Sequence, residues 1–401
     1  MISVNRDRLL ADLRDLARIG QYQTGVDRIA FSPADIEARQ WLAARFRAAG
    51  LDTSIDRFGT VYGAAPNSRR SILIGSHSDT VPRGGWLDGA LGVIYALEIA
   101  RAAQEAGASG VGVDAVSFQD EEGTYFAFLG SLSLIDALDP QAMAVAQSTN
   151  GHKLSDAIKS AGLRGEPRRL EPGRQIAFLE AHIEQGPRLE HSGNRIGIVT
   201  GIVGIRRLRI VSHGRADHAG TTPMAMRRDA LAPLLRLGCF VADRFPALAG
   251  ADTVWNIGRI EAMPGAANVV PTRAQLILEF RDTEIALLDR MEQEVVREIA
   301  RLNAAGAEIE REPIATIAPT AMDARLAETF ERAAADLRYP TQRMASGAGH
   351  DAMIMARRIP SAMIFVPSIG GRSHDVAENT NDDDIVAGCM VMARAVERLT
   401  A

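Results

Sequence analysis

The chain has 401 residues, which is too long for one compact core and predicts two or three domains. Apolar residues make up 46% and charged residues 24%, so wholesale disorder is excluded. The formal net charge of -5 argues against a nucleic-acid partner, because such proteins usually carry a basic excess. The two cysteines, Cys239 and Cys389, lie far apart in the sequence, which excludes a disulfide scaffold and a thiolate zinc finger.

The N-terminal residues MISVNRDRLL contain no apolar signal-peptide core. No apolar run approaches the ~18 residues of a membrane span. We therefore expect a cytoplasmic protein without a membrane partner.

Helices and strands alternate in the first third of the predicted structure. Apolar residues at three- and four-residue spacing predict a helix over 9–19, and Ser32 as N-cap followed by Pro33 predicts another that ends at Gly50. A further helix is expected over 90–106. Short apolar or alternating runs predict strands at 53–58, 60–65, 71–75 and 111–118. This alternation predicts an α/β domain with a mostly parallel sheet.

The middle of the chain has a different order of elements. Strands are predicted at 206–212, 253–261, 275–282 and 307–313, with helices at 227–245 and 283–304. The order β-α-β-β-α-β is that of a ferredoxin-like α+β domain. Elements at 323–337, 362–366 and 383–399 then resume the α/β pattern. We therefore expect a catalytic α/β domain of residues 1–204 and 318–401, interrupted by an insert of residues 205–317.

Histidines and carboxylates follow several of the predicted strands. His77 comes directly after the strand at 71–75, and a carboxylate at Asp79 would be placed to receive its second ring N–H. Asp88 precedes a helix, so it is either a member of this polar site or an ordinary helix N-cap. Glu121 and Glu122 follow the strand at 111–118. One interpretation is that this acidic segment supplies one metal ligand and one general base, and the alternative is a solvated acidic turn.

Two further histidines extend this set. The segment EAHIEQG places His182 and Glu184 on one face of a strand, and His374 lies in a polar loop before the last helix. Each histidine alone is more often structural than a ligand. Together, imidazole and carboxylate groups at strand edges favour zinc, manganese, cobalt or nickel over a soft-metal site. Two ions that share one carboxylate need about five ligands, and this set supplies them with a base left over.

The insert carries its own polar motifs. His218 lies in a loop of small residues, where a simple turn histidine is the alternative. Asn268 follows two alanines. Arg281 ends a strand, where its guanidinium could form a surface salt bridge or bind a substrate carboxylate in a bidentate manner. No GxSxG elbow, P-loop or GxGxxG with an acidic ribose partner occurs. Cys239 falls within an apolar helix, which favours packing over nucleophilic chemistry.

The motifs, taken in order, resemble one known family. They are SHSDTV, WLDGALGV, QDEEG, EAHIEQGP, ADHAGTTPM, GAANVVPT, EFRD and GRSHD, and the resemblance that includes them runs from about residue 5 to the C-terminus. The sequence resembles the M20-type metallopeptidase superfamily. More narrowly it is similar to the hydantoinase/carbamoylase branch, which contains N-carbamoyl-L-amino acid amidohydrolases, allantoate amidohydrolases and β-ureidopropionases. Peptidase branches typically have a carboxylate where His182 stands.

The resemblance implies a role for each matching residue. His77 and His182 would hold one divalent ion, Glu122 and His374 the other, and Asp88 would bridge them. Asp79 would orient His77, and Glu121 would be the general base. The substrate would be contacted by Gln185, by Asn268 and by Gly347, the last of which lies in the 346–351 loop. Arg281 would bind the substrate carboxylate. The family forms homodimers through the insert, which is its lid domain, and His218 would act in the active site of the other subunit.

The activity expected from this resemblance is hydrolysis of an N-carbamoyl-L-amino acid to amino acid, ammonia and CO2. The ions would be Zn²⁺ or Mn²⁺, with Co²⁺ or Ni²⁺ as alternatives. Allantoate and N-carbamoyl-β-alanine remain alternative substrates. A dipeptidase or N-acyl amino acid deacylase is more distant, because of His182. A non-enzymatic binding protein would not need the ligands and the base together. Residues 126–128 could shape the pocket or simply pack.

Overall fold

The computed structural model describes residues 2–107 and 110–400. Contacts divide the chain into two compact units, of which Gly201–Ala321 is one and the remaining described residues are the other. The expected insert, 205–317, lies inside the first of these ranges. In the described ranges, no helix combines the length and apolar character needed to cross a bilayer.

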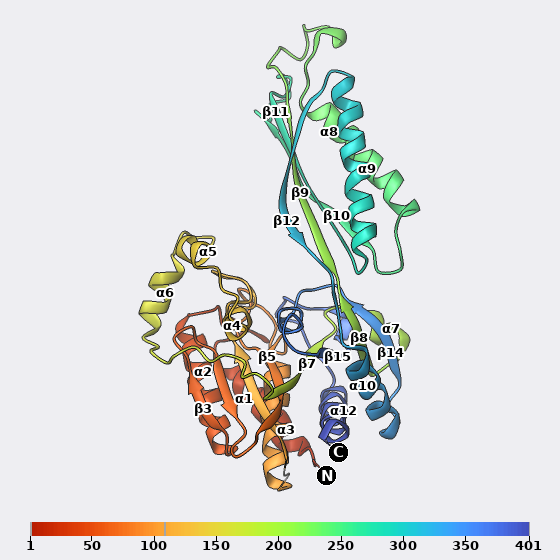
Figure 1. Cartoon of the computed structure of the whole chain (residues 1–401). Helices are drawn as coiled ribbons and strands as arrows, with labels where there is room; N and C mark the ends of the chain where they lie inside the picture. Colours follow the sequence, from red (N-terminus) through yellow and green to blue (C-terminus); the bar gives the residue numbers. More distant parts are fainter. Residues whose placement is uncertain (1, 108–109, 401) are drawn as a thin grey trace. The chain divides into compact units, whose positions relative to one another are not determined.

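The larger unit contains the N- and C-terminal parts of the chain (Figure 1). Its helices are α1 (Arg6–Arg18), α2 (Pro33–Ala48), α3 (Ala90–Glu105), α4 (Leu129–Leu134), α5 (Pro140–Val145), α6 (Leu154–Ala161), α7 (Arg188–Ser192), α10 (Ala324–Asp336), α11 (Asp351–Met355) and α12 (Asp382–Thr400). The strands are β3 (Asp52–Ile55), β4 (Val61–Ala64), β5 (Arg70–His77), β6 (Val111–Phe118), β7 (Gln175–Ile183), β8 (Ile196–Ile202), β14 (Thr341–Ser346) and β15 (Ser361–Val366), with a small pair β1 (Gln21–Tyr22) and β2 (Gly25–Val26). The two-residue strand β13 (Thr320–Ala321) ends the Gly201–Ala321 range and pairs with the end of β8.

The large sheet has the order β13-β8-β15-β7-β5-β6-β4-β3, and β14 pairs with β8. Its four central strands, β15, β7, β5 and β6, run parallel, and the pairs toward both edges are antiparallel. The predicted α/β class with a mostly parallel sheet is confirmed. The carboxyl ends of the four parallel strands meet along one edge of the sheet.

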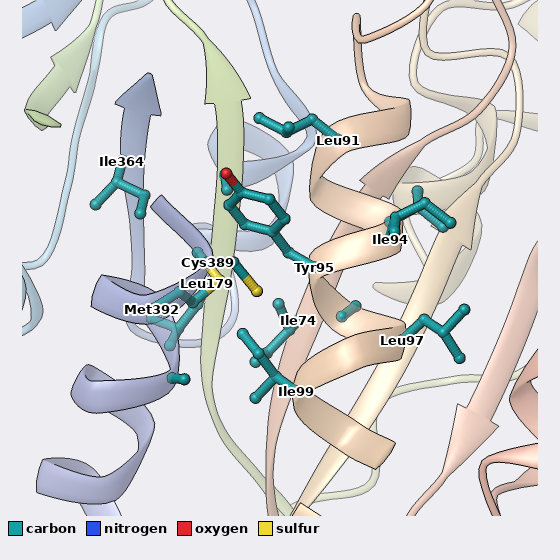
Figure 2. Close-up of a cluster of buried hydrophobic side chains, with 14 of the residues drawn as sticks. Ile74, Leu91, Ile94, Tyr95, Leu97, Ile99, Leu179, Ile364, Cys389 and Met392 are labelled. Carbon is teal, nitrogen blue, oxygen red and sulfur yellow. The ribbon is translucent and has the colours of Figure 1, made fainter. Parts of the chain in front are cut away.

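The main core lies where helices α3 and α12 pack on these strands (Figure 2). Ile74 of β5, Leu179 of β7, Tyr95 of α3 and Cys389 of α12 all belong to this layer. The Tyr95 hydroxyl donates to the main-chain oxygen of Ile385, so its polar atom is satisfied inside the core. This packing fixes the strand ends that carry the polar residues described below.

The smaller unit has the predicted β-α-β-β-α-β order. Its elements are β9 (Gly204–His213), η1 (Met224–Met226), α8 (Leu231–Arg244), η2 (Phe245–Ala247), β10 (Val254–Met263), β11 (Arg273–Asp282), α9 (Ile285–Ala304) and β12 (Glu308–Ile317). The sheet is antiparallel with the order β10-β11-β9-β12, which is the ferredoxin-like arrangement. Buried residues alternate along β9 and β11, because one face of the sheet packs on α8 and α9.

Two expectations for this unit were wrong in detail. Helix α8 begins at Leu231 and not at residue 227, because the carboxylate of Asp229 accepts from the main-chain N–H groups of Leu231 and Ala232 and caps the helix there. Cys239 on this helix is exposed, so packing does not account for it.

Candidate metal centre

The expected ligands gather at the carboxyl edge of the parallel strands. His77 is the last residue of β5, Glu121 and Glu122 follow β6, and His182 is the penultimate residue of β7. His374 follows β15 in the loop before α12. Because these strands are neighbours in the sheet, side chains separated by up to 297 residues in sequence come into one cluster.

Asp88 lies at the centre of the three histidines. Its Oδ1 is 3.0 Å from His182 Nε2 and 3.5 Å from His77 Nε2, and its Oδ2 is 3.2 Å from His374 Nε2. The N-cap of α3 is the next residue, Gly89, which has no side chain for capping. The alternative that Asp88 is an ordinary N-cap is therefore wrong, and its carboxylate joins two sets of imidazoles.

The ring orientation of two histidines is fixed by the main chain. Nδ1 of His77 is 2.9 Å from the main-chain oxygen of Asp79, and Nδ1 of His182 is 2.9 Å from that of Ile183. A carbonyl oxygen only accepts hydrogen bonds, so each Nδ1 carries the hydrogen and each Nε2 points into the cluster. Gly89 N–H donates to Nε2 of His182 at 3.1 Å, which requires a lone pair on that nitrogen. This is the arrangement of a metal-ligating imidazole.

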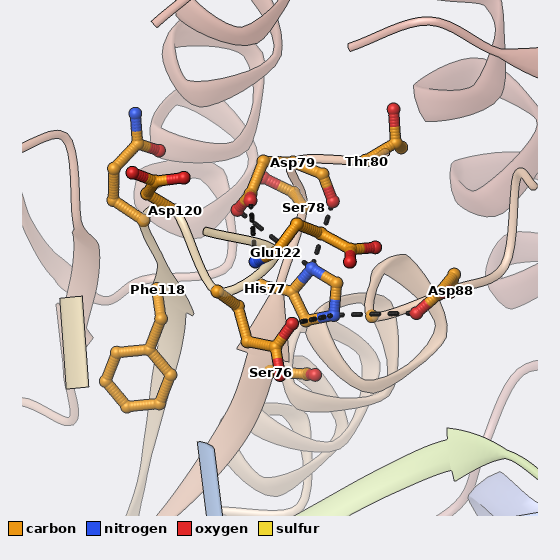
Figure 3. A network of polar contacts seen from close by, with 12 residues as sticks. Ser76, His77, Ser78, Asp79, Thr80, Asp88, Phe118, Asp120 and Glu122 are labelled. Carbon is orange, nitrogen blue, oxygen red and sulfur yellow. Dashed lines mark hydrogen bonds and ion pairs between the residues drawn. The ribbon is translucent and has the colours of Figure 1, made fainter. Parts of the chain in front are cut away.

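The role of Asp79 differs from the expectation. Its carboxylate is 4.0 Å from His77 Nδ1, so the main-chain oxygen, and not the carboxylate, receives the ring N–H. The carboxylate instead lies 3.5 Å from the guanidinium of Arg39, which also pairs with Asp35 at 2.9 Å. All three of these charged side chains are fully buried behind the cluster. Figure 3 shows His77 between Asp79 and Asp88.

The donor cluster contains several buried carboxylates. The Glu121 and Glu122 side chains are each only 9% exposed. Burial raises the pKa of Glu121 well above its usual value, with Glu122 adding to the shift, and burial together with Asp88 raises the pKa of Glu122 to about 8. Burial alone would lower the pKa of His77, but Glu121 and Asp88 raise it well above its usual value. The cluster therefore favours bound positive charge.

The donor atoms form three groups of a size that a metal ion would fit. They are His77, Asp88 and His182; Asp88, Glu122 and His374; and His77, Glu121 and Glu122, with the atoms of each group within 4.8 Å of one another. The first two groups share only Asp88. In the part of the chain that the structure describes, Oε1 of Glu122 is buried without a hydrogen-bond partner. Nitrogen and oxygen donors of this kind suit a borderline divalent ion.

Gln185 lies beside this cluster. Its amide Nε2 is 3.0 Å from Asp88 Oδ2 and 3.3 Å from His374 Nε2, whereas its Oε1 is buried without a hydrogen-bond partner among the described residues. Its backbone has a φ of 58°, a conformation that non-glycine residues rarely adopt and that often marks functional sites. Glu184 does not share this position, since its carboxylate accepts from the N–H groups of Arg188 and Leu189 at the start of α7.

The loop after β14 also reaches the cluster. The ring of His350, which sequence reasoning left without a role, is buried with its centroid 4.5 Å from that of His182. Burial lowers the pKa of His350 well below its usual value, and its Nε2 is 2.9 Å from Ser346 Oγ. Within the described chain, a Cβ added at Gly347 would meet open space, so local packing does not demand a glycine there. Gly89 is different, because a Cβ there would lie 2.4 Å from Nε2 of His77.

The three expected residues of the smaller unit do not come together. His218 and Asn268 occupy adjacent loops, where Ala219 N–H donates to the main-chain oxygen of Asn268 at 3.0 Å. Arg281 lies at the far end of β11, and its Nε donates to Glu279 at 2.7 Å. From Arg273, next to the Asn268 loop, to Arg281 the strand spans about 26 Å at the usual rise per residue. One copy of this unit therefore holds His218 and Arg281 at opposite ends of its sheet.

His218 has a defined tautomer. The N–H of Gly220 donates to its Nδ1 at 3.1 Å, so the ring hydrogen of the neutral form is on Nε2. The side chain is exposed and can present that N–H as a hydrogen-bond donor.

The fold and the cluster agree with the comparison to known families. The model of peptidase family M20/M25/M40 matches residues 73–398. The chain therefore belongs to this family of hydrolases.

Individual relatives narrow the assignment. An N-carbamoyl-L-amino acid amidohydrolase of Geobacillus stearothermophilus is 33% identical over 99% of both chains. An allantoate amidohydrolase of Escherichia coli (strain K12) is 36% identical over 94% of this chain and 93% of its own. The crystal structure of an amidase of the hydantoinase/carbamoylase family from Burkholderia phymatum superposes with a TM-score of 0.92 at 45% identity, covering 99% of this chain and 98% of its own. Within the family, this protein is an amidohydrolase of the hydantoinase/carbamoylase branch.

Proposed function

We propose that the protein is a metal-dependent amidohydrolase that removes the carbamoyl group of an N-carbamoyl-L-amino acid. The observation that carries the proposal is the position of Asp88, whose two oxygens face His77 and His182 on one side and His374 on the other. A shared carboxylate between two ligand sets is what a pair of divalent ions requires. The larger unit would thus be the catalytic domain.

The ligand sets follow from the three groups of donors. His77, His182 and Asp88 would hold one ion, and Asp88, Glu122 and His374 the other, with Zn²⁺ or Mn²⁺ suited to both. Such ions, when bound, supply Lewis acidity that polarises a carbonyl and makes water more acidic. Of the carboxylates in the three groups of donors, this assignment leaves Glu121 without a ligand role.

Glu121 would act as the general base. Its place beside Glu122 and His77 puts its carboxylate at the donor cluster, where it can take a proton from the attacking water. Water adds to the ureido carbonyl carbon, the bond to the amino acid nitrogen breaks, and Glu121 returns the proton to that nitrogen. The carbamic acid that leaves decomposes to ammonia and CO2.

Further residues are proposed to contact the substrate. The unpaired Oε1 of Gln185 is placed to accept a substrate N–H, and the open space at Gly347 leaves room for the ligand. Arg281 would bind the carboxylate, while Asn268 and the Nε2–H of His218 would donate to the substrate and to the developing oxyanion.

The geometry of the smaller unit supports the proposal of a homodimer. A small ureido acid is much shorter than the strand that separates His218 from Arg281 in one copy. If both residues serve one substrate, they come from different copies of the chain. We therefore propose that a dimer formed through the smaller unit completes each site.

Allantoate is the second candidate substrate, because the relative named for it is 36% identical to this chain. Residues near the acidic motif do not separate the two, since Phe126 packs in a small cluster with Phe58, Leu129 and Leu154. N-carbamoyl-β-alanine is a third ureido substrate, and an acylated amino acid is the most distant one.

An ammonia-release assay with added Mn²⁺ tests the proposal. N-carbamoyl-L-methionine, N-carbamoyl-β-alanine and allantoate are compared side by side, and N-acetyl-L-methionine is scored by its free amine. We expect turnover of N-carbamoyl-L-methionine that a chelator abolishes. Turnover of allantoate alone would select the second candidate, and cleavage of only the acetyl compound would refute a ureido substrate.

A further inference from the structure

A second buried carboxylate lies against the main chain of the Asp88 loop. Glu378 is only 2% exposed and belongs to the loop between His374 and α12. Its Oε1 accepts from the N–H groups of Leu87 and Asp88, both at 3.0 Å, and its Oε2 accepts from Ser373 Oγ at 2.9 Å. One carboxylate thus joins two loops that are 290 residues apart in sequence.

Glu378 contacts the main chain of Asp88 and is linked to its side chain through Ser373. It holds the main-chain N–H directly, and it holds Ser373, whose Oγ is 3.2 Å from Asp88 Oδ2. Ser373 precedes His374, which faces the same Oδ2 at 3.2 Å. The contact therefore fixes the shared carboxylate and the most exposed histidine of the cluster relative to each other.

The loop is shaped to receive this side chain. A Cβ added at Gly85 would lie 1.9 Å from both Cδ and Oε1 of Glu378, so only glycine leaves space for the carboxylate. Burying a carboxylate is costly unless its oxygens are hydrogen-bonded, and here the three donors satisfy that need. Close packing and hydrogen bonds thus independently locate Glu378 at the same point.

We propose that Glu378 is a positioning residue that sets the distance between the two halves of the donor cluster through Asp88 and Ser373. Among the described residues, Glu378 belongs to none of the three groups of donors that a metal ion would fit. The inference rests on the proposed metal-dependent function, and it assigns to Glu378 the geometry of the ligands and not the chemistry of hydrolysis.

Two substitutions separate length from charge. Glu378→Gln keeps the length, and its amide oxygen still accepts from Leu87 and Asp88 while its NH2 group donates to Ser373. Glu378→Asp keeps the charge but shortens the side chain by one methylene, so it loses contact with one of the loops. A positioning role predicts that Gln preserves the site better than Asp, whereas a purely electrostatic role predicts the reverse.

The experiment measures Co²⁺ and Zn²⁺ affinity by chelator competition, the visible absorption spectrum of the Co²⁺ form, and thermal unfolding, all without substrate. We expect Glu378→Asp to weaken metal affinity about 10–100-fold and to alter the Co²⁺ spectrum, as loss of a residue that supports ligands does. The metal affinity of Glu378→Gln should stay within about threefold of the wild-type affinity, because the hydrogen bonds that support the ligands are kept.

A control variant separates positioning from general stability. Asp56 is also buried and accepts from two main-chain N–H groups, those of Phe58 and Thr60, in a turn without proposed ligands. Asp56→Ala should lower the unfolding temperature while leaving metal affinity and the Co²⁺ spectrum unchanged.

The possible results separate this inference from the proposed function. Wild-type metal affinity and spectrum in Glu378→Asp, or a larger loss in Gln than in Asp, would overturn the positioning role alone. A wild-type chain that binds metal but hydrolyses no ureido compound would overturn the proposed substrate class and leave the positioning role standing. A wild-type chain that binds neither ion would overturn both.

Discussion

The main-chain oxygen of Asp79 lies 2.9 Å from Nδ1 of His77, while the carboxylate of the same residue is 4.0 Å away and faces Arg39. The orientation of His77 is therefore a property of the backbone at the end of β5. The carboxylate of Asp79 belongs to a buried charge network with Arg39 and Asp35.

Asp79→Asn should accordingly spare His77. We expect metal affinity to change by less than about tenfold, because the main-chain acceptor remains, whereas loss of a true outer-shell partner costs about 10–100-fold. The free energy of unfolding should fall by about 1–3 kcal/mol, because Arg39 loses one of its two charged partners. Chelator competition and urea denaturation of the metal-free protein measure the two quantities. A 100-fold loss of metal affinity would return the orienting role to the carboxylate.

Arg39→Met should be more damaging to the fold. It leaves Asp35 and Asp79, both fully buried, without their cation, at a cost of about 3–5 kcal/mol in the free energy of unfolding. Arg45→Met on the same helix is the matched control. Arg45 is 40% exposed and pairs with Asp12 and Asp15 at 3.6 and 3.4 Å, so its loss should cost at most about 1 kcal/mol. Equal urea midpoints for the two variants would contradict this account.

The sequence was sufficient to predict the parallel strands and most of the cluster. Buried strands such as β5 and β6 are continuous apolar runs. His77 and Glu121 stand out because one ends such a strand and the other comes three residues after one. The same reasoning missed β8, because Gly197 and Gly201 interrupt its pattern. It also missed the short helices α4 to α7 and α11, which have too few turns to show a helical period.

Three features of the site were beyond that reasoning. Glu378 is an ordinary acidic residue in sequence, and only its approach to Gly85 and Asp88 distinguishes it. The choice between the carboxylate and the main-chain oxygen of Asp79 depends on about one ångström, which spacing in a sequence does not specify. The separation of His218 from Arg281 required the strand register of the smaller unit.

Glu121→Gln should separate binding from turnover. The amide removes the base, so turnover of the ureido substrate should fall by about 10²–10⁴-fold. Metal content should remain that of the wild type, because His77, Asp88, His182, Glu122 and His374 are unchanged. Steady-state kinetics and metal analysis of the same preparation check both parts. A rate close to wild type would refute Glu121 as the base, and a protein depleted of metal would make it a ligand.

Metal removal should destabilise the protein. Without cations, Glu121, Glu122 and Asp88 are close carboxylates in a buried place, and bound ions relieve that repulsion. Each of the two ions, when free at 100 times its dissociation constant, should add about 2.7 kcal/mol to the free energy of unfolding. Thermal unfolding of chelated and reconstituted protein measures the gain. The Asp88→Asn variant is the control and should gain much less, so an equal gain would place the ions elsewhere.

Mixing two inactive variants tests the dimer. His218→Ala and Arg281→Ala should each lose most turnover, because one removes an oxyanion donor and the other the carboxylate clamp. If His218 serves the partner's site, a mixed dimer has one intact site and one doubly impaired site. Random exchange of equal amounts of the two variants should then restore about a quarter of the wild-type activity. The double variant His218→Ala/Arg281→Ala, mixed with either single variant, is the control, because no such dimer contains an intact site. If the exchanged mixture of single variants stays at the activity of its parents, His218 and Arg281 do not meet at one substrate across two copies, and the shared site is refuted.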